Sequence, residues 1–187
     1  MASKLRVNSI LPVDGVPTGG GGGIVQVVST NVDSTSTTTL TTQDTFYEIT
    51  ALTTTITTVS ANSKILVTAG IGGEASHEDY YLAFRCGRVV GGSLTYIFKG
   101  ADASNRVTAL SMGVPGYYAN DQASTSSYQT YPNMLDSPNQ SAGTAITYKV
   151  QASIGTDSGN VYLNYAEAND QYSGNTASTI VVMEVSA

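Results

Sequence analysis

Few residues in this chain could do chemistry, because it has one cysteine, Cys86, and one histidine, His77. A nucleophilic thiol needs a nearby base, and His77 lies nine residues away, in a segment rich in glycine and acidic residues. Cys86 instead ends a mainly apolar run, residues 82–86, which is typical of a cysteine packed as a small hydrophobe. We therefore expect no Cys–His pair. A single cysteine also excludes an intrachain disulfide and a four-cysteine zinc site.

The densest group of titratable side chains comprises Glu74, His77, Glu78 and Asp79. Its spacing matches no metal-binding motif such as HExxH, and we expect a solvated acidic loop. A glycosidase needs two carboxyl groups in one cleft. The acidic residues available for such a pair all fall in predicted turns, and the sequence pairs none of them: Asp121, Asp136, Asp157, Glu167 and Asp170. We therefore expect a protein that is not an enzyme and uses no cofactor or metal.

Residues 114–143 form a long polar stretch with four tyrosines, and long loops on a rigid scaffold often carry function. Tyrosine offers contact area with little loss of rotamer freedom, and neighbouring amide and carboxyl groups can bond to sugar hydroxyls. The candidate ligand-binding residues are Tyr117, Tyr118, Asn120, Asp121, Tyr128 and Tyr131. Alternatively, the tyrosines pack this stretch onto the domain or at a subunit contact. The sequence leaves both readings open.

Composition excludes several classes of partner for this chain of 187 residues. Charged residues make up 12%, about half of the ~25% usual in soluble domains, and the formal net charge is −6. An acidic chain with eight basic residues is a poor binder of phosphate backbones, so we expect no nucleic-acid partner. No apolar run reaches the roughly 18 residues needed to span a bilayer, and the N-terminus lacks a signal-peptide apolar stretch. We expect no membrane insertion.

The elements expected to hold these residues are β-strands, because branched and aromatic residues are abundant and straight-chain helix formers are scarce. Residues 146–154 alternate strictly between apolar and polar, and residues 65–71 repeat the pattern. Turn clusters of Gly, Pro, Asn and Asp separate the runs. The predicted strands cover roughly 24–30, 35–41, 45–50, 52–59, 64–71, 80–89, 94–98, 106–113, 144–154, 161–166 and 178–186. Short strands at this spacing predict an all-β, antiparallel jelly roll or β-sandwich.

The chain divides into a short extended N-terminal segment, residues 1–23, and a β domain, residues 24–187. The segment ends in five consecutive glycines, which hold no fixed shape alone and are typical of a linker or of close packing between chains. Its apolar residues need a surface on which to dock: Leu5, Val7, Ile10 and Leu11. At the other end, residues 179–185 are apolar on both faces, as in a central strand or one covered by another subunit. We expect Ile180 and Val182 at an oligomer interface.

The opening Lys4-Leu-Arg-Val-Asn-Ser-Ile10, with Pro12, Gly15-Val-Pro-Thr18 and the glycine run into Ile24-Val-Gln-Val-Val28, resembles the start of tailed-phage fibre and appendage proteins. Those of marine phages and cyanophages are most similar. Three later stretches are also similar to this group: 44–49, 63–67 and 178–185. The stretch 114–143 matches no pattern of the group, so it would set what is particular to this protein.

The resemblance implies an N-terminal attachment segment and a C-terminal jelly roll that is usually trimeric. The protein is accordingly expected in the virion, as a non-catalytic trimeric fibre, knob or decoration subunit. Residues 1–23 would then bind other virion proteins. The first alternative is a module that recognises a glycan on the host surface through the tyrosines of 114–143. The second is a polysaccharide depolymerase, although 187 residues leave no room for the long β-helix usual in such enzymes.

Overall fold

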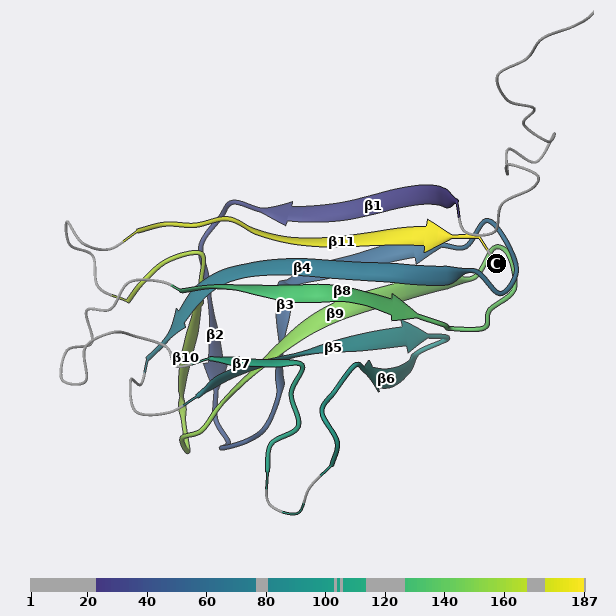
Figure 1. Cartoon of the computed structure of the whole chain (residues 1–187). Helices are drawn as coiled ribbons and strands as arrows, with labels where there is room; N and C mark the ends of the chain where they lie inside the picture. The colour runs from purple at the N-terminus through teal and green to yellow at the C-terminus, as the bar shows by residue number, and fades with distance from the viewer. Residues whose placement is uncertain are drawn as a thin grey trace, which may run out of the picture.

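The computed structural model describes residues 23–76, 81–102, 104, 106–113, 127–167 and 174–186, with the backbone alone for 127–132. These residues form β-strands joined by turns and loops (Figure 1), and none of them belongs to a helix that could cross a membrane. The strands are β1 (Ile24–Val32), β2 (Ser36–Leu40), β3 (Tyr47–Thr57), β4 (Lys64–Ala75), β5 (Leu82–Val90), β6 (Ser93–Ile97), β7 (Ser111–Gly113), β8 (Ser127–Asp136), β9 (Ala145–Ile154), β10 (Gly159–Leu163) and β11 (Ser178–Val185).

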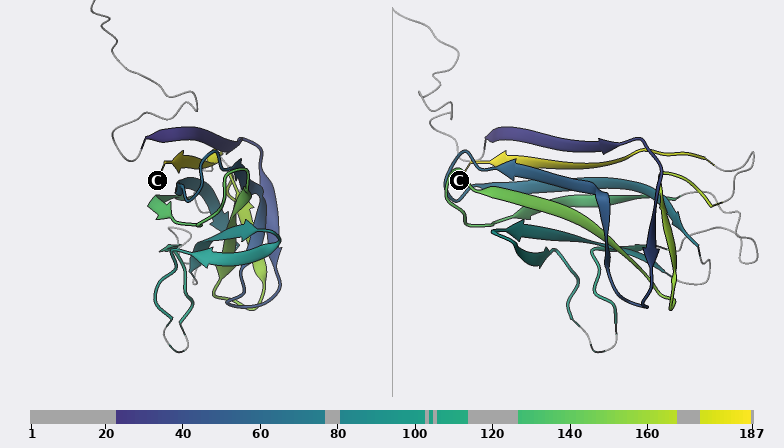
Figure 2. Two further views of the ribbon diagram at one scale, coloured as in Figure 1. Left: turned by 90° about the vertical axis from the view of Figure 1, so that its right-hand side faces the viewer. Right: turned by 180° about the vertical axis from the view of Figure 1, so that it is seen from behind.

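The strands form two antiparallel sheets packed face to face (Figures 1 and 2). Sheet A has the order β1-β11-β4-β10-β2, with β8 also paired to β4, and sheet B has the order β3-β9-β5-β6, with β7 also paired to β5. The expected all-β, antiparallel sandwich is therefore confirmed. Strand β4 is the centre of sheet A. Its residues 64–70 pair with β11 and its residues 73–75 with β10, while β8 lies along the opposite edge.

The core lies between the sheets, and the alternation in the sequence decides which side chains enter it. On β9 the five apolar residues Ile146, Tyr148, Val150, Ala152 and Ile154 are buried, as the period-2 pattern predicted. Residues 65, 67, 69 and 71 of β4 behave in the same way. Both strands place one apolar face inward because successive side chains of a strand point to opposite sides of the sheet.

Two expectations about the strands are wrong. The expected strands 45–50 and 52–59 are one strand, β3, with a register shift between Glu48 and Thr53 where it pairs with β9. Residues 127–136, expected within a loop, form β8. Between the pairs Met134–Val67 and Tyr131–Ala69, β8 has two residues where β4 has one. Pro132 falls in this bulge, where a missing backbone donor does least harm to the ladder.

Candidate assembly surface

Most of the predicted site residues lie outside the described part of the chain. This holds for Tyr117, Tyr118, Asn120 and Asp121, and for the attachment residues Leu5, Val7, Ile10 and Leu11. Tyr128 and Tyr131 belong to β8, where their backbones pair with Gly72 and Ala69. The tyrosine-rich stretch is thus partly a strand of sheet A.

The two residues expected at an oligomer interface, Ile180 and Val182, are instead in the core. Each has an exposed fraction of 0%, because sheet B covers the inner face of β11. Strand β11 lies inside sheet A, between β1 and β4. This is one of the two arrangements predicted from the apolar residues on both of its faces. Any contact with another molecule must use the outer face of β11, which carries Val181, Met183 and Val185.

The outer face of sheet A carries a row of apolar side chains that crosses four strands. Val27 of β1 lies opposite Met183 of β11, Met183 lies opposite Leu66 of β4, and Leu66 lies opposite Leu135 of β8. Val27 is 55% exposed and Leu135 is 46% exposed, while Met183 and Leu66 are half-buried. Side chains directly opposite each other in antiparallel strands are near neighbours, so the four form one continuous apolar surface.

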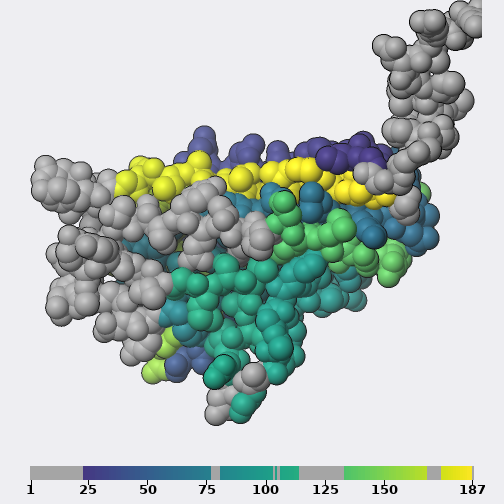
Figure 3. Space-filling model, viewed as in Figure 1, coloured from purple at the N-terminus to yellow at the C-terminus, as the bar shows by residue number. Residues whose placement is uncertain are grey.

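A second line of apolar residues extends this surface toward the chain ends. Ile24, which is 59% exposed, lies opposite Val185 at the point where β1 begins. We call Ile24, Val27, Leu66, Leu135, Val181, Met183 and Val185 the apolar row. Figure 3 shows β1 and β11 side by side on this face, and the C-terminal part of β8 lies on the same face beyond β4. Isolated exposed apolar residues are ordinary, whereas a contiguous set on one face marks an interaction surface.

Strand β1 adds a second feature, because it is an edge strand whose only pairing among the described strands is with β11. Its sequence, IVQVVSTNV, is nine residues long and contains neither a charged residue nor a proline. Edge strands of monomeric proteins are usually protected from pairing by charges, prolines or short length. The free edge of β1 therefore lies beside the apolar row without any of these protections.

Glu184 is a charged residue on the inward face of β11. It lies between Met183 and Val185, and its carboxylate points inward with an exposed fraction of 0%. The backbone amides of Val59 and Ser60, in the β3–β4 turn, donate to it at 2.9 Å, and Gln26 Nε2 donates at 2.5 Å. Burial opposes ionisation of Glu184, but these hydrogen bonds outweigh it, so its pKa lies below the ordinary value. A charged residue in an apolar strand is thus satisfied inside the sandwich.

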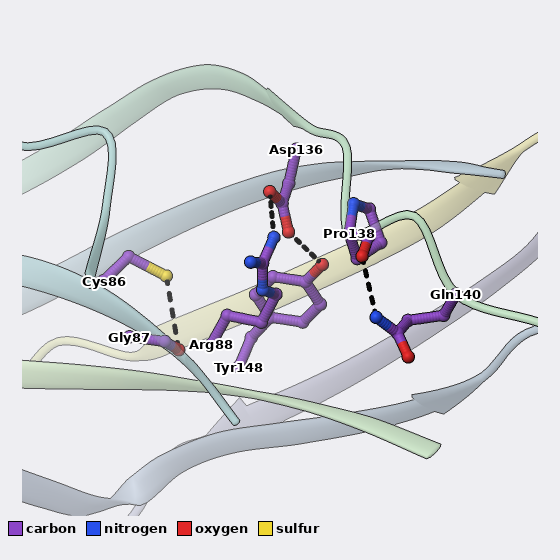
Figure 4. A network of polar contacts seen from close by, with 7 residues as sticks. All are labelled: Cys86, Gly87, Arg88, Asp136, Pro138, Gln140 and Tyr148. Atoms are coloured by element: carbon purple, nitrogen blue, oxygen red, sulfur yellow. Dashed lines mark hydrogen bonds and ion pairs between the residues drawn. The ribbon is translucent and has the colours of Figure 1, made fainter. Parts of the chain in front are cut away.

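A second buried carboxylate, Asp136, joins the end of β8 to sheet B (Figure 4). Arg88 Nη1 donates to its Oδ1 at 2.6 Å, and the Tyr148 hydroxyl donates to its Oδ2 at 2.8 Å. Burial and the neighbouring Asp136 charge raise the pKa of Tyr148. All the polar partners of Asp136 shown here are within the domain, so this network holds the two sheets together at one end.

The described residues offer little for catalysis. Cys86 is fully buried, and burial together with the Asp136 charge raises the pKa of its thiol to about 12, so it is neither accessible nor ionised at neutral pH. Of the five acidic residues considered for a hydrolase, Asp136 is taken by Arg88, and Glu167 accepts a hydrogen bond from Tyr162 at 2.7 Å. No group of three metal-ligating side chains occurs in the described ranges. The apolar row is the candidate site that these residues support best.

No known protein family and no curated protein matches this chain. Similar solved structures include the Gx strain of infectious bursal disease virus, at 14% identity and a TM-score of 0.38 over 87% of this chain and 36% of that chain. The VP2 subviral particle of infectious bursal disease virus is similar at 14% identity and a TM-score of 0.39, over 87% of this chain and 38% of that chain. The Gt strain of the virus is similar at 12% identity and a TM-score of 0.40, over 97% of this chain and 45% of that chain. This chain spans less than half the length of these proteins.

Proposed function

We propose that this chain is a non-catalytic structural subunit of a virus particle that assembles with copies of itself through the apolar row. The observation that carries the proposal is the continuity of the row across β1, β11, β4 and β8, with exposed fractions of 59%, 55% and 46% at Ile24, Val27 and Leu135. Burying the exposed half of each of these side chains contributes about 1 kcal/mol. In a closed ring of three or more copies the same interface recurs between each pair of neighbouring subunits, so this free energy is gained at every contact.

The assignment to a virus particle rests on the sequence. The segments 4–28, 44–49, 63–67 and 178–185 are similar to those of tailed-phage appendage proteins, and that group is usually trimeric. The fold agrees with the jelly-roll domain that the resemblance implies. We therefore propose a trimer on the virion surface as the functional form.

The point where residues 1–22 join the domain supports an attachment role for them. Ser186 N donates to Gly23 O at 3.0 Å, so the beginning of β1 is joined to the end of β11. Ile24, which follows Gly23, and Val185, which precedes Ser186, both belong to the apolar row. A segment that binds another virion protein would therefore leave the domain beside the surface where copies of the domain meet.

Native mass spectrometry of the full chain tests the assembly surface. We expect the wild type as a trimer, and Val27→Asp as a folded monomer of 19.4 kDa, because an aspartate cannot be buried unpaired at an interface. Met112→Asp is the matched control, since Met112 is 50% exposed on β7 of sheet B. It should leave the oligomer intact.

Three results would overturn parts of this proposal. A wild-type monomer at micromolar concentration would remove self-assembly. An oligomer that survives Val27→Asp but dissociates with Met112→Asp would move the interface to sheet B. Immunogold labelling of particles of the virus that encodes the chain tests the virion assignment, and unlabelled particles would contradict it.

A further inference from the structure

A pocket of about 280 Å³ opens on the outer face of sheet B, on the opposite side of the sandwich from the apolar row. Three segments far apart in the sequence line it: Asp44 and Phe46 before β3, Arg85 on β5, and Arg106, Val107 and Thr108 in the β6–β7 connection. Arg85 lies between Phe84 and Cys86, whose side chains are buried in the core, so its own side chain points outward.

The Arg85 guanidinium is held in place by groups of the protein. Its Cζ lies 4.0 Å from the centroid of the Phe46 ring and 3.6 Å from that of the Tyr96 ring. Its Nε donates to Gln151 Oε1 at 2.8 Å, and Gln151 is only 8% exposed. Stacking and one fixed hydrogen bond set the plane of the fork, which leaves the two Nη groups to bind a ligand at a small entropic cost.

The β5–β6 hairpin is shaped to bring Tyr96 over Arg85. Gly91 and Gly92 both have positive φ, as a two-residue type I′ turn requires, and this turn sets Tyr96 opposite Gly87. A Cβ at Gly87 would stand 2.7 Å from Leu94 Cδ1. The glycine thus makes room for the side chains of β6 to lie flat on sheet B.

The loop that carries Arg106 and Thr108 joins β6 to β7 (Figure 1), and hydrogen bonds hold its two arms together at the base. Gly100 N donates to Ala109 O at 3.1 Å, and Thr108 Oγ1 donates to Asp102 Oδ1 at 3.1 Å. Lys99 pairs with the same Asp102 carboxylate at 2.6 Å. These contacts join the two arms of the connection and hold its second arm beside Arg85.

The charge of the pocket contrasts with that of the chain. Two guanidinium groups and one carboxylate line it, a local excess of +1 in a protein whose net charge is −6. Arg88, Lys99 and Lys149 each form an ion pair with a carboxylate. Among the described residues, neither Arg85 nor Arg106 does so, and Asp44 accepts a hydrogen bond from the Tyr81 hydroxyl instead. The pocket therefore favours an anion.

We propose that this pocket binds a carboxylate-bearing sugar unit of the hexuronic-acid class. The sugar carboxylate pairs with the arginines, whose planar forks match its two oxygens. Hydroxyl groups of the sugar donate to Asp44 and Thr108, and its apolar ring face packs on Phe46 and Val107. The volume is near the lower end of that of ligand pockets, which suits one sugar unit and not a long polymer segment.

This inference goes beyond the assembly role and does not depend on it. The apolar row and the pocket lie on the outer faces of different sheets, so association through sheet A leaves the pocket open. Loss of the oligomer in Val27→Asp should leave sugar binding unchanged, and loss of sugar binding should leave the oligomer unchanged. The two proposals can therefore fail separately.

Calorimetric titration of the full chain with sodium D-glucuronate is the test, with D-glucose as the uncharged analogue and acetate and inorganic phosphate as the anions without a sugar ring. We expect glucuronate to bind more tightly than all three. Arg106→Gln should weaken glucuronate binding at least tenfold, or about 1.4 kcal/mol. Lys64→Gln, which removes the same charge from an exposed position on β4, should change it less than twofold.

Each of the other outcomes would overturn the proposal. Absence of glucuronate binding removes the site. Equal binding of acetate or phosphate reduces it to a general anion site, and equal binding of glucose removes the role of charge. Arg85→Lys keeps the charge but loses the fork, its stacking on the rings and its hydrogen bond to Gln151. It should weaken glucuronate binding in a variant that circular dichroism shows to be folded. Binding that survives both arginine changes would place the sugar elsewhere.

Discussion

Replacing Glu184 with glutamine tests how strongly its buried carboxylate holds the β3–β4 turn against β11. The variant keeps the shape of the side chain and loses its charge. One oxygen can still accept from Val59 N and Ser60 N, but the new amide group faces Gln26 Nε2, which is also a donor. Rotating the Gln26 amide does not solve this, because Gln26 Nε2 also donates to Thr57 O at 2.6 Å. One donor is therefore left without an acceptor.

The free-energy cost follows from these contacts. A hydrogen bond to a charged group contributes about 1.5–3 kcal/mol, and an unsatisfied buried donor costs about 1–3 kcal/mol. We expect Glu184→Gln to lower the free energy of unfolding by about 2–3 kcal/mol, which corresponds to a melting temperature lower by about 4–12 °C for a domain of this size. Urea denaturation and calorimetry at one protein concentration measure both quantities.

Glu48→Gln is the matched control, because Glu48 forms an ion pair with Lys149 whose side chains are 34% and 27% exposed. Such a pair contributes at most about 1 kcal/mol. The pH dependence separates charge from shape. The folded pKa of Glu184 lies below its ordinary value of 4.5, so its contribution is complete above that pH and is lost as the pH falls through the folded pKa.

The stability difference between the wild type and Glu184→Gln should therefore be constant from neutral pH to about pH 5 and then shrink. A difference that persists unchanged in acid would refute the electrostatic account. A variant as mild as Glu48→Gln would show that the carboxylate does not hold the β3–β4 turn.

Two further predictions follow from the described contacts. Asp136→Asn leaves Arg88, whose side chain is 19% exposed, without its counterion and should lower the free energy of unfolding by about 3 kcal/mol. Tyr148→Phe removes one hydrogen bond and should lower it by about 1–2 kcal/mol. Urea denaturation measures both values, and the reverse order would contradict the network. Deletion of residues 1–22 should leave a folded oligomer with a melting temperature within about 2 °C of the wild type, because β1 begins at Ile24. The shortened protein should no longer be incorporated into particles. An unfolded product would place the segment in the core.

The sequence alone determined the strands in which one face is apolar. Residues 146–154 and 65–71 alternate so regularly that a slip by one residue would expose the whole apolar set, so neither their state nor their buried face was in doubt. It also determined that Cys86 is a core residue and that the domain is an antiparallel sandwich. These conclusions depend on local periodicity and composition, which the sequence contains in full.

The tertiary structure decided what periodicity could not. Along residues 179–185 both faces are apolar, and only pairing with β1 and β4 over sheet B made Ile180 and Val182 core residues and left Val181, Met183 and Val185 outside. Strand β8 is polar and contains a proline, so it exists because β4 offers it a free edge. The arginine pocket brings together Asp44, Phe46, Arg85 and residues 106–108, which share no local pattern. Each depends on contacts between distant segments, and these form only when the two sheets pack.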